Sequence, residues 1–150
     1  MLGEKSAPLS GVVRDAILGN PASGRRRLGL TIEVEIAGQQ TEAIIDTAAP
    51  YLICSPDLAE RLNLGPADAL ESLDILIRGT RIRGGSHRAE FTLFASEGAS
   101  LSVEATAFVP DAAHNFGAHH PSFIGYAGCL ERMRFAIDPH TETFYFGPLP

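Results

Sequence analysis

The sequence predicts an all-β domain, either a barrel or a sandwich, with one or two short helices. Residues 28–36 carry an apolar side chain at every even position and Thr or Glu at positions 31, 33 and 35, the period of a half-buried strand. Residues 101–109 alternate in the same way. Glycine, proline and aspartate recur roughly every ten residues between such runs, which is typical of many short strands joined by turns.

The first half of the chain begins with a strand expected within residues 11–18, followed by a loop at 19–24 that combines Gly, Asn, Pro and Ser. The strand at 28–36 and a second one at 41–46 flank a tight turn, so we expect a hairpin. The apolar run at 51–54 predicts a short buried strand.

A short helix is predicted at residues 57–62. Ser55 is a suitable N-cap, and Pro56 fits the first helical position because its missing N–H has no partner there. Gly65 and Pro66 end the helix.

The second half predicts further strands, separated by glycines at 79, 84 and 85. These strands are expected at 73–77, 80–83, 88–95, 101–109, 123–125, 134–137 and 143–146. A second short helix is expected within 126–133.

The charge balance excludes one class of partner. The chain has 18 acidic and 12 basic side chains, a formal charge of −6, whereas phosphate binding needs a basic surface, so we expect no nucleic acid partner. The run Arg25-Arg26-Arg27 is read as a solvated loop. No stretch approaches the ~20 apolar residues of a membrane span, and residues 1–15 lack the apolar core of a signal peptide. A cytoplasmic protein without a membrane partner is the expectation.

The two cysteines, Cys54 and Cys129, form no metal or redox motif. Two packed free thiols fit a reducing compartment, and a disulfide between them is the alternative. Cys129 as a nucleophile is disfavoured because it lies on the apolar side of the expected second helix.

Of the five histidines, His114, His119 and His120 cluster in one loop. Their spacing matches no metal motif, so we read them as surface residues and expect no metal and no cofactor.

The candidate catalytic residue is Asp46. Three apolar residues lead directly into it, and small residues follow. A carboxylate so close to the core is costly unless it is hydrogen-bonded or protonated. The plain alternative is a turn aspartate at the end of a strand.

Two segments resemble the signatures of the retropepsin-like aspartic peptidases. The first signature is an apolar pair, then Asp, Thr or Ser, Gly, and Ala or Ser; in this chain it reads Ile44-Ile45-Asp46-Thr47-Ala48-Ala49. The second is an apolar pair followed by glycine and a short helix; here it reads Phe123-Ile124-Gly125. The resemblance spans residues 28–150, which would form the peptidase domain, with residues 1–27 as an N-terminal arm or first strand with a flexible loop.

The resemblance implies a closed barrel of the acid-protease type with one catalytic aspartate per chain. Such a chain must form a homodimer to bring two aspartates together. It also implies that Thr47 locks the two active loops together, and that a flap at Arg78, Gly79 and Thr80 folds over a bound peptide. The terminal strand at 144–147 is expected at the dimer interface.

The implied reaction is hydrolysis of a peptide bond in a peptide or protein substrate by water. One carboxylate must be ionised to accept the proton of the water, and the other must be protonated to polarise the carbonyl. Two adjacent carboxylates share a proton in this way because both cannot ionise; aspartic proteases are the standard example of this effect.

The match fails at Ala48, where the family has glycine. The added methyl group lies at a crowded point, although the backbone N–H is kept. The flap also carries Arg78, Arg81 and Arg83, which would either favour acidic substrates or lie in a solvated hairpin. Two functions therefore remain open: an active aspartic endopeptidase, or a catalytically weak or inactive peptide-binding or scaffolding module with the same fold.

Overall fold

The protein is an all-β barrel, as the sequence predicts. The computed structural model describes residues 11–13, 17–18, 30–77, 79–111 and 119–150. A ring of strands closes on itself because its first strand pairs with its last. In spatial order the ring contains β3 (Leu30–Ile36), β4 (Gln39–Ile45), β10 (Ser122–Ile124), β5 (Leu52–Ile53), β9 (Leu101–Pro110) and β7 (Thr80–Leu93).

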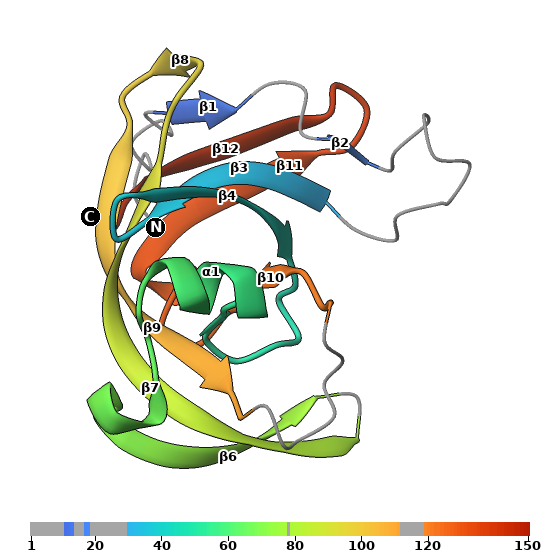
Figure 1. Ribbon diagram of the computed structural model, residues 1–150. Coiled ribbons are helices and arrows are strands. Elements are labelled where there is room, and N and C mark those ends of the chain that lie inside the picture. Colours follow the sequence, from blue (N-terminus) through green and yellow to red (C-terminus); the bar gives the residue numbers. More distant parts are fainter. Residues whose placement is uncertain (1–10, 14–16, 19–29, 78, 112–118) are drawn as a thin grey trace.

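Additional strands extend this ring and build a second sheet (Figure 1). β2 (Ile17–Leu18) pairs with β3, and β6 (Glu71–Ile77) pairs with β7. The second sheet has the order β11 (Met133–Asp138), β12 (Thr143–Pro148), β1 (Gly11–Val13) and β8 (Glu97–Gly98). The single strand predicted within 11–18 is thus replaced by β1 and β2, which belong to different sheets. The loop predicted at 19–24 and the Arg25-Arg26-Arg27 run lie outside the described residues.

The hairpin of β3 and β4 forms as its alternation predicts. Ile32, Val34 and Ile36 are at most 3% exposed and face the core, while Glu33 faces solvent. The turn uses Ala37 and Gly38, both with positive φ, which matches the right-handed twist of the two strands.

Strand β7 corrects one prediction. The separate strands expected at 80–83 and 88–95 form one strand of 14 residues, and Gly84 and Gly85 lie inside it. A Cβ at Gly84 would collide with the carbonyl oxygen of Val109 and approach the ring of Phe108 to 2.6 Å. Gly84 therefore allows close packing against β9, Gly85 allows close packing against Ala69, and neither glycine interrupts the strand.

Helix α1 (Pro56–Arg61) has the predicted cap, since the Ser55 hydroxyl accepts a hydrogen bond from the Leu58 amide at 3.2 Å. A 3-10 turn, η2 (Pro66–Asp68), follows it. The second helix predicted at 126–133 is wrong in extent, because only the 3-10 turn η3 (Leu130–Arg132) forms. Gly128 has φ +70°, which an α-helix cannot accommodate.

Two groups of buried apolar side chains stabilise the barrel. The larger fills the barrel and includes Val34, Phe91, Phe144 and Phe146. The second apolar cluster is smaller and comprises Ala49, Ile53, Ile75, Ile82 and Phe108, with Tyr51, Leu73, Ile77 and Phe123 packed against it. None of the helices in the described part of the chain has the length and apolar character needed to cross a bilayer.

Candidate active site

Asp46 is the first residue after β4, where the strand passes into a loop. Its backbone amide donates a hydrogen bond to the carbonyl of Ile124 at 3.0 Å, and its own carbonyl accepts one from the Ala49 amide at 3.0 Å. The side chain is half-buried, and its Oδ1 accepts a hydrogen bond from the Ala48 amide at 3.1 Å. The carboxylate is therefore held by its own loop at the edge of the core.

The two predicted motifs meet in the structure although they are far apart in the sequence. β10 lies between β4 and β5, parallel to the first and antiparallel to the second. Phe123 is the register partner of both Ile44 and Ile53, which places the Phe123-Ile124-Gly125 segment beside the segment that leads into Asp46.

Backbone hydrogen bonds fix the loop after Asp46 to the chain after β10. The Gly125 amide donates to the Tyr51 carbonyl, the Tyr126 amide to the Ala49 carbonyl, and the Tyr51 amide to the Ala127 carbonyl, each at 2.8 Å. These three hydrogen bonds join residues 49–51 to residues 125–127 and fix the two segments relative to each other. The sequence alone gave no signal for the parts played by Tyr51, Tyr126 and Ala127, because they act through backbone atoms.

Gly125 is required at this contact. A Cβ at Gly125 would lie 2.6 Å from the Ala49 carbonyl oxygen and would also collide with the carbonyl oxygen of Tyr51. Tyr51 itself has φ +58°, an uncommon conformation for a bulky residue. Its two hydrogen bonds to residues 125 and 127 stabilise this strained backbone.

Ala48 replaces the glycine of the signature without backbone strain. Its φ does not lie in the left-handed region, and its N–H binds the Asp46 carboxylate as a glycine N–H would. Thr47 and Ala48 are both exposed, so the methyl group of Ala48 points out of the crowded core. The loop thus presents small exposed residues beside one carboxylate.

Comparisons with known proteins bear on the fold. No known protein-family profile and no curated protein sequence matches the chain. Among solved structures, a retropepsin-like aspartic protease from Rickettsia conorii aligns over 94% of this chain and 94% of its own, with a TM-score of 0.61 and 14% identity. The chain has a retropepsin-like fold. The retroviral protease-like domain of Ddi1 from Leishmania major also aligns, over 81% of this chain and 94% of its own, with a TM-score of 0.51 and 18% identity.

In this retropepsin-like fold, the β6–β7 hairpin packs against the Asp46 loop through the second apolar cluster. Ile75 and Ile82 of the hairpin contribute to the cluster together with Ala49 of the loop. Gly79, at the turn of the hairpin, has φ +80°, which suits glycine. Arg78, predicted with Gly79 and Thr80 as the flap, lies outside the described residues.

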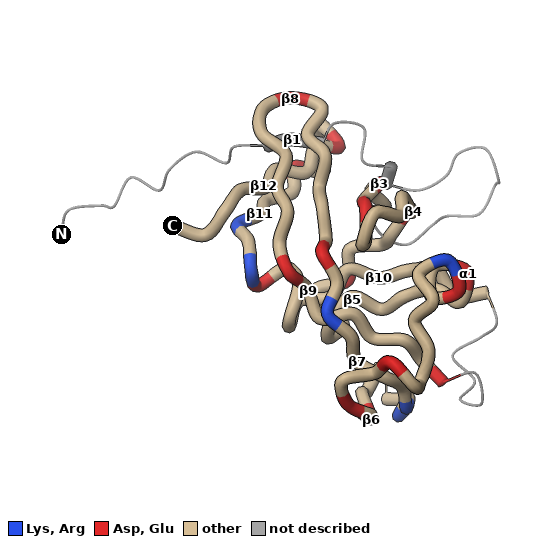
Figure 2. The backbone as a smooth tube through the Cα atoms, turned by 60° about the vertical axis from the view of Figure 1, so that its left-hand side comes forward, with Lys and Arg blue, Asp and Glu red and all other residues tan. Residues whose placement is uncertain are grey.

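The arginines of the hairpin lie on the face opposite the second apolar cluster. Arg83 donates to Asp74 at 3.0 Å, and Arg81 lies 3.8 Å from the same carboxylate. Because successive strand residues face opposite sides, Arg81 and Arg83 point away from Ile82 and the Asp46 loop. The reading of a solvated hairpin is favoured over acidic substrate recognition. In Figure 2 the basic positions of the described chain are scattered among acidic ones.

The cysteines and histidines form no second candidate site within the part of the chain that the structure describes. Cys54 and Cys129 are free and buried, and burial raises the pKa of each thiol to about 12, which leaves neither ionised at neutral pH. Within the described residues no three His, Cys, Asp or Glu side chains form a group that could hold a metal ion. The Nδ1 of His120 lies 2.9 Å from the Pro121 carbonyl, His119 is exposed, and His114 lies outside the described residues.

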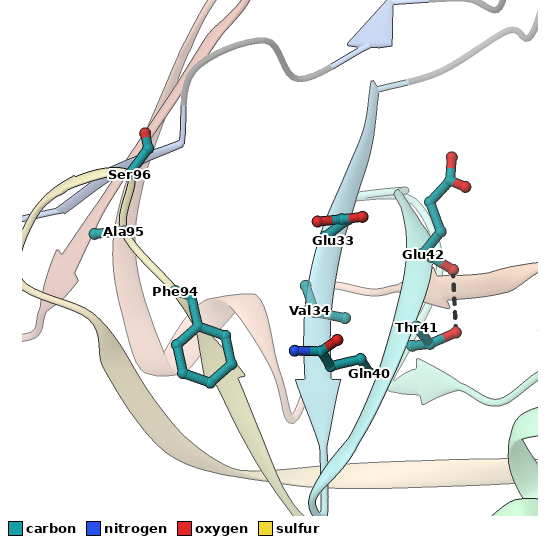
Figure 3. A pocket seen from close by; sticks show the side chains of 8 residues that line it. All are labelled: Glu33, Val34, Gln40, Thr41, Glu42, Phe94, Ala95 and Ser96. Carbon is teal, nitrogen blue, oxygen red and sulfur yellow. Dashed lines mark hydrogen bonds between the residues drawn. The ribbon is translucent and has the colours of Figure 1, made fainter.

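The structure also has a surface pocket of about 540 Å³ (Figure 3). It is formed by β3, β4 and the residues that follow β7, with Phe94 across from Glu33 and Gln40. Asp46 is not among its lining residues, so this pocket is separate from the candidate active site.

Proposed function

We propose that this chain is an aspartic-type endopeptidase whose active site forms from two copies of Asp46 at the axis of a homodimer. The observation that carries the proposal is the fixed, half-buried Asp46 carboxylate in an exposed loop of small residues, within a retropepsin-like fold. One chain supplies one such carboxylate. A two-fold axis through the exposed Thr47 and Ala48 would bring the second copy beside the first.

The paired carboxylates would share one proton, so that one acts as the general base and the other as the general acid. The ionised group accepts a proton from water, and the resulting nucleophile attacks the scissile carbonyl carbon. The protonated group donates its proton to the carbonyl oxygen, which gives a neutral tetrahedral diol. Proton transfer to the amide nitrogen then allows the C–N bond to break, releasing a carboxylic acid and an amine without a covalent enzyme intermediate.

The proposed substrate is an extended peptide or protein segment bound between the subunits. The β6–β7 hairpin would cover it, because its apolar face already packs on the Asp46 loop. Backbone hydrogen bonds to such a segment give affinity without a fixed sequence. The buried free thiols favour a reducing compartment such as the cytoplasm, and the net charge of −6 disfavours a nucleic acid partner.

Ala48 favours a second candidate function. Its methyl group adds bulk beside the carboxylate, where the signature has glycine. A dimer that binds extended peptides but hydrolyses them slowly or not at all would keep every other feature of the site.

The test is digestion of a diverse peptide library at several pH values by the wild type and by Asp46→Asn, with and without a statine-type inhibitor. Cleavage by the wild type that the inhibitor blocks, together with an inactive variant, supports the endopeptidase. A folded dimer that binds peptides but cleaves none at any pH favours the binding module.

A further inference from the structure

His87, on β7, is a buried polar residue that the proposed chemistry does not use. It is 4% exposed, and its Nε2 has no hydrogen-bond partner among the described residues. Buried polar atoms nearly always have a partner, so an unpaired ring nitrogen needs an explanation.

The ring lies beside Gly85, on the face of β7 against which the chain that leaves η2 packs. A Cβ at Gly85 would come within 3.4 Å of Nε2 of His87 and 2.7 Å of the Cβ of Ala69, the residue that ends η2. The next residue, Leu70, donates its amide to the Ser86 carbonyl at 2.8 Å. The missing side chain at Gly85 therefore leaves room on this face of β7 for both Ala69 and the His87 ring.

The surroundings favour the neutral ring. Burial lowers the pKa of His87, and the carboxylate and backbone of Asp68 on η2 oppose this effect only in part. Across the β7–β9 ladder its partner is the apolar Ala107. On β6, Glu71 pairs with Ser86 and so lies on the other face of the sheet. An imidazolium would carry a second N–H, at Nε2, for which the described residues supply no acceptor.

We propose that protonation of the buried His87 imidazole detaches η2 from β7 and frees the base of the β6–β7 hairpin. β6 begins three residues after η2 and pairs with β7 from Glu71 onward. Loss of the η2 contact therefore exposes the first paired residues of β6 and β7, which begin with Glu71 and Ser86. The device is a pH-sensitive latch on the hairpin that packs against the Asp46 loop.

The direction of the effect follows from linkage. The open form has an accessible histidine with a pKa of about 6.5, whereas the closed form has a lowered one, so opening takes up a proton. Above about pH 6.5 both forms are neutral and the latch is unaffected by pH. As the pH falls below this value, the closed form progressively loses stability relative to the open form.

Hydrogen–deuterium exchange, corrected for intrinsic rates, tests the latch at about pH 7.5 and about pH 5.0 on the intact chain. In the wild type we expect protection in residues 66–77 to fall roughly tenfold on acidification, while residues 133–148 lose little. His87→Leu should abolish this local loss. His140→Gln, which changes an exposed turn histidine, should behave as the wild type.

An unchanged wild type, a uniform loss over the whole barrel, or a full local loss in His87→Leu would each overturn the latch. If His87→Leu does not fold, the NMR titration of the His87 ring in the wild type must share its midpoint with the local loss, and a mismatch rejects the proposal. No substrate is involved, so the result is independent of peptidase activity.

Discussion

The amide of Asp46 donates a hydrogen bond to the carbonyl of Ile124 at 3.0 Å, which continues the parallel ladder of β4 and β10 by one residue. This bond ties the candidate catalytic residue to the second motif. The position of the carboxylate therefore depends on β10 as well as on β4. Substitutions that displace β10 should also displace Asp46.

Gly125→Ala, at the residue after β10, tests the close packing that joins the two motifs. The new Cβ would meet the backbone oxygens of Ala49 and Tyr51, so we expect a loss of about 1–3 kcal/mol in the free energy of unfolding. Gly65→Ala is the matched control, because nothing lies within 4 Å of its Cβ, and it should change stability by less than about 0.5 kcal/mol. Urea unfolding of the wild type and both variants measures these free energies of unfolding. Equal stability of the two would contradict the close packing described at Gly125.

Ala48→Gly tests whether alanine limits the site. Alanine fits the backbone here without strain, so glycine should lower the unfolding free energy by about 0.5–1 kcal/mol through greater freedom of the unfolded chain. If the methyl group restrains catalysis, kcat should rise while the fold is retained. Peptide cleavage and thermal unfolding are measured on the same samples. A variant that is more stable than the wild type would disprove the unstrained backbone at this position.

The buried thiols give a prediction for pH. Burial raises the pKa of Cys54 and Cys129 to about 12. At pH 8 roughly one thiol in ten thousand is then ionised, so iodoacetamide should label the native protein far more slowly than the urea-unfolded chain. The raised pKa also stabilises the folded state below about pH 8.5, and this contribution is lost as the pH rises from there toward 12. Rapid labelling of either native thiol would refute their burial.

Mixing subunits tests the shared site. If each active site needs two copies of Asp46, a threefold excess of Asp46→Asn should reduce the activity of a fixed amount of wild type to about one quarter after subunit exchange, by random pairing. A site complete within one chain predicts unchanged activity. A Glu142→Gln chain, altered at an exposed residue in the turn between β11 and β12, serves as the active competitor, and the same threefold excess of it should raise the total activity about fourfold.

The all-β class could be predicted because its strands alternate and its turns contain the residues that turns require, whereas the closed barrel followed from the resemblance of the two motifs. The β3–β4 hairpin and the Ser55 cap of α1 depend on neighbours in the sequence, so local patterns were sufficient. Gly84 and Gly85 misled the prediction because their role is to accommodate β9 and η2, which are distant in the sequence.

The site could be predicted only in part for the same reason. Asp46 and Gly125 stand in recognisable motifs, but the strained backbone of Tyr51 is stabilised by hydrogen bonds with residues 125 and 127. His87 also gave no signal, since its burial depends on η2 folding back over Gly85. Such relationships exist only once the chain has folded.

The most direct test of the central claim is the peptidase activity of Asp46→Asn beside the wild type, with sedimentation and circular dichroism on both. The account predicts a folded dimer in each case and a loss of at least about a thousandfold in kcat/KM for the variant, because asparagine cannot accept a proton from water. A folded Asp46→Asn dimer that cleaves peptides at the wild-type rate would contradict it.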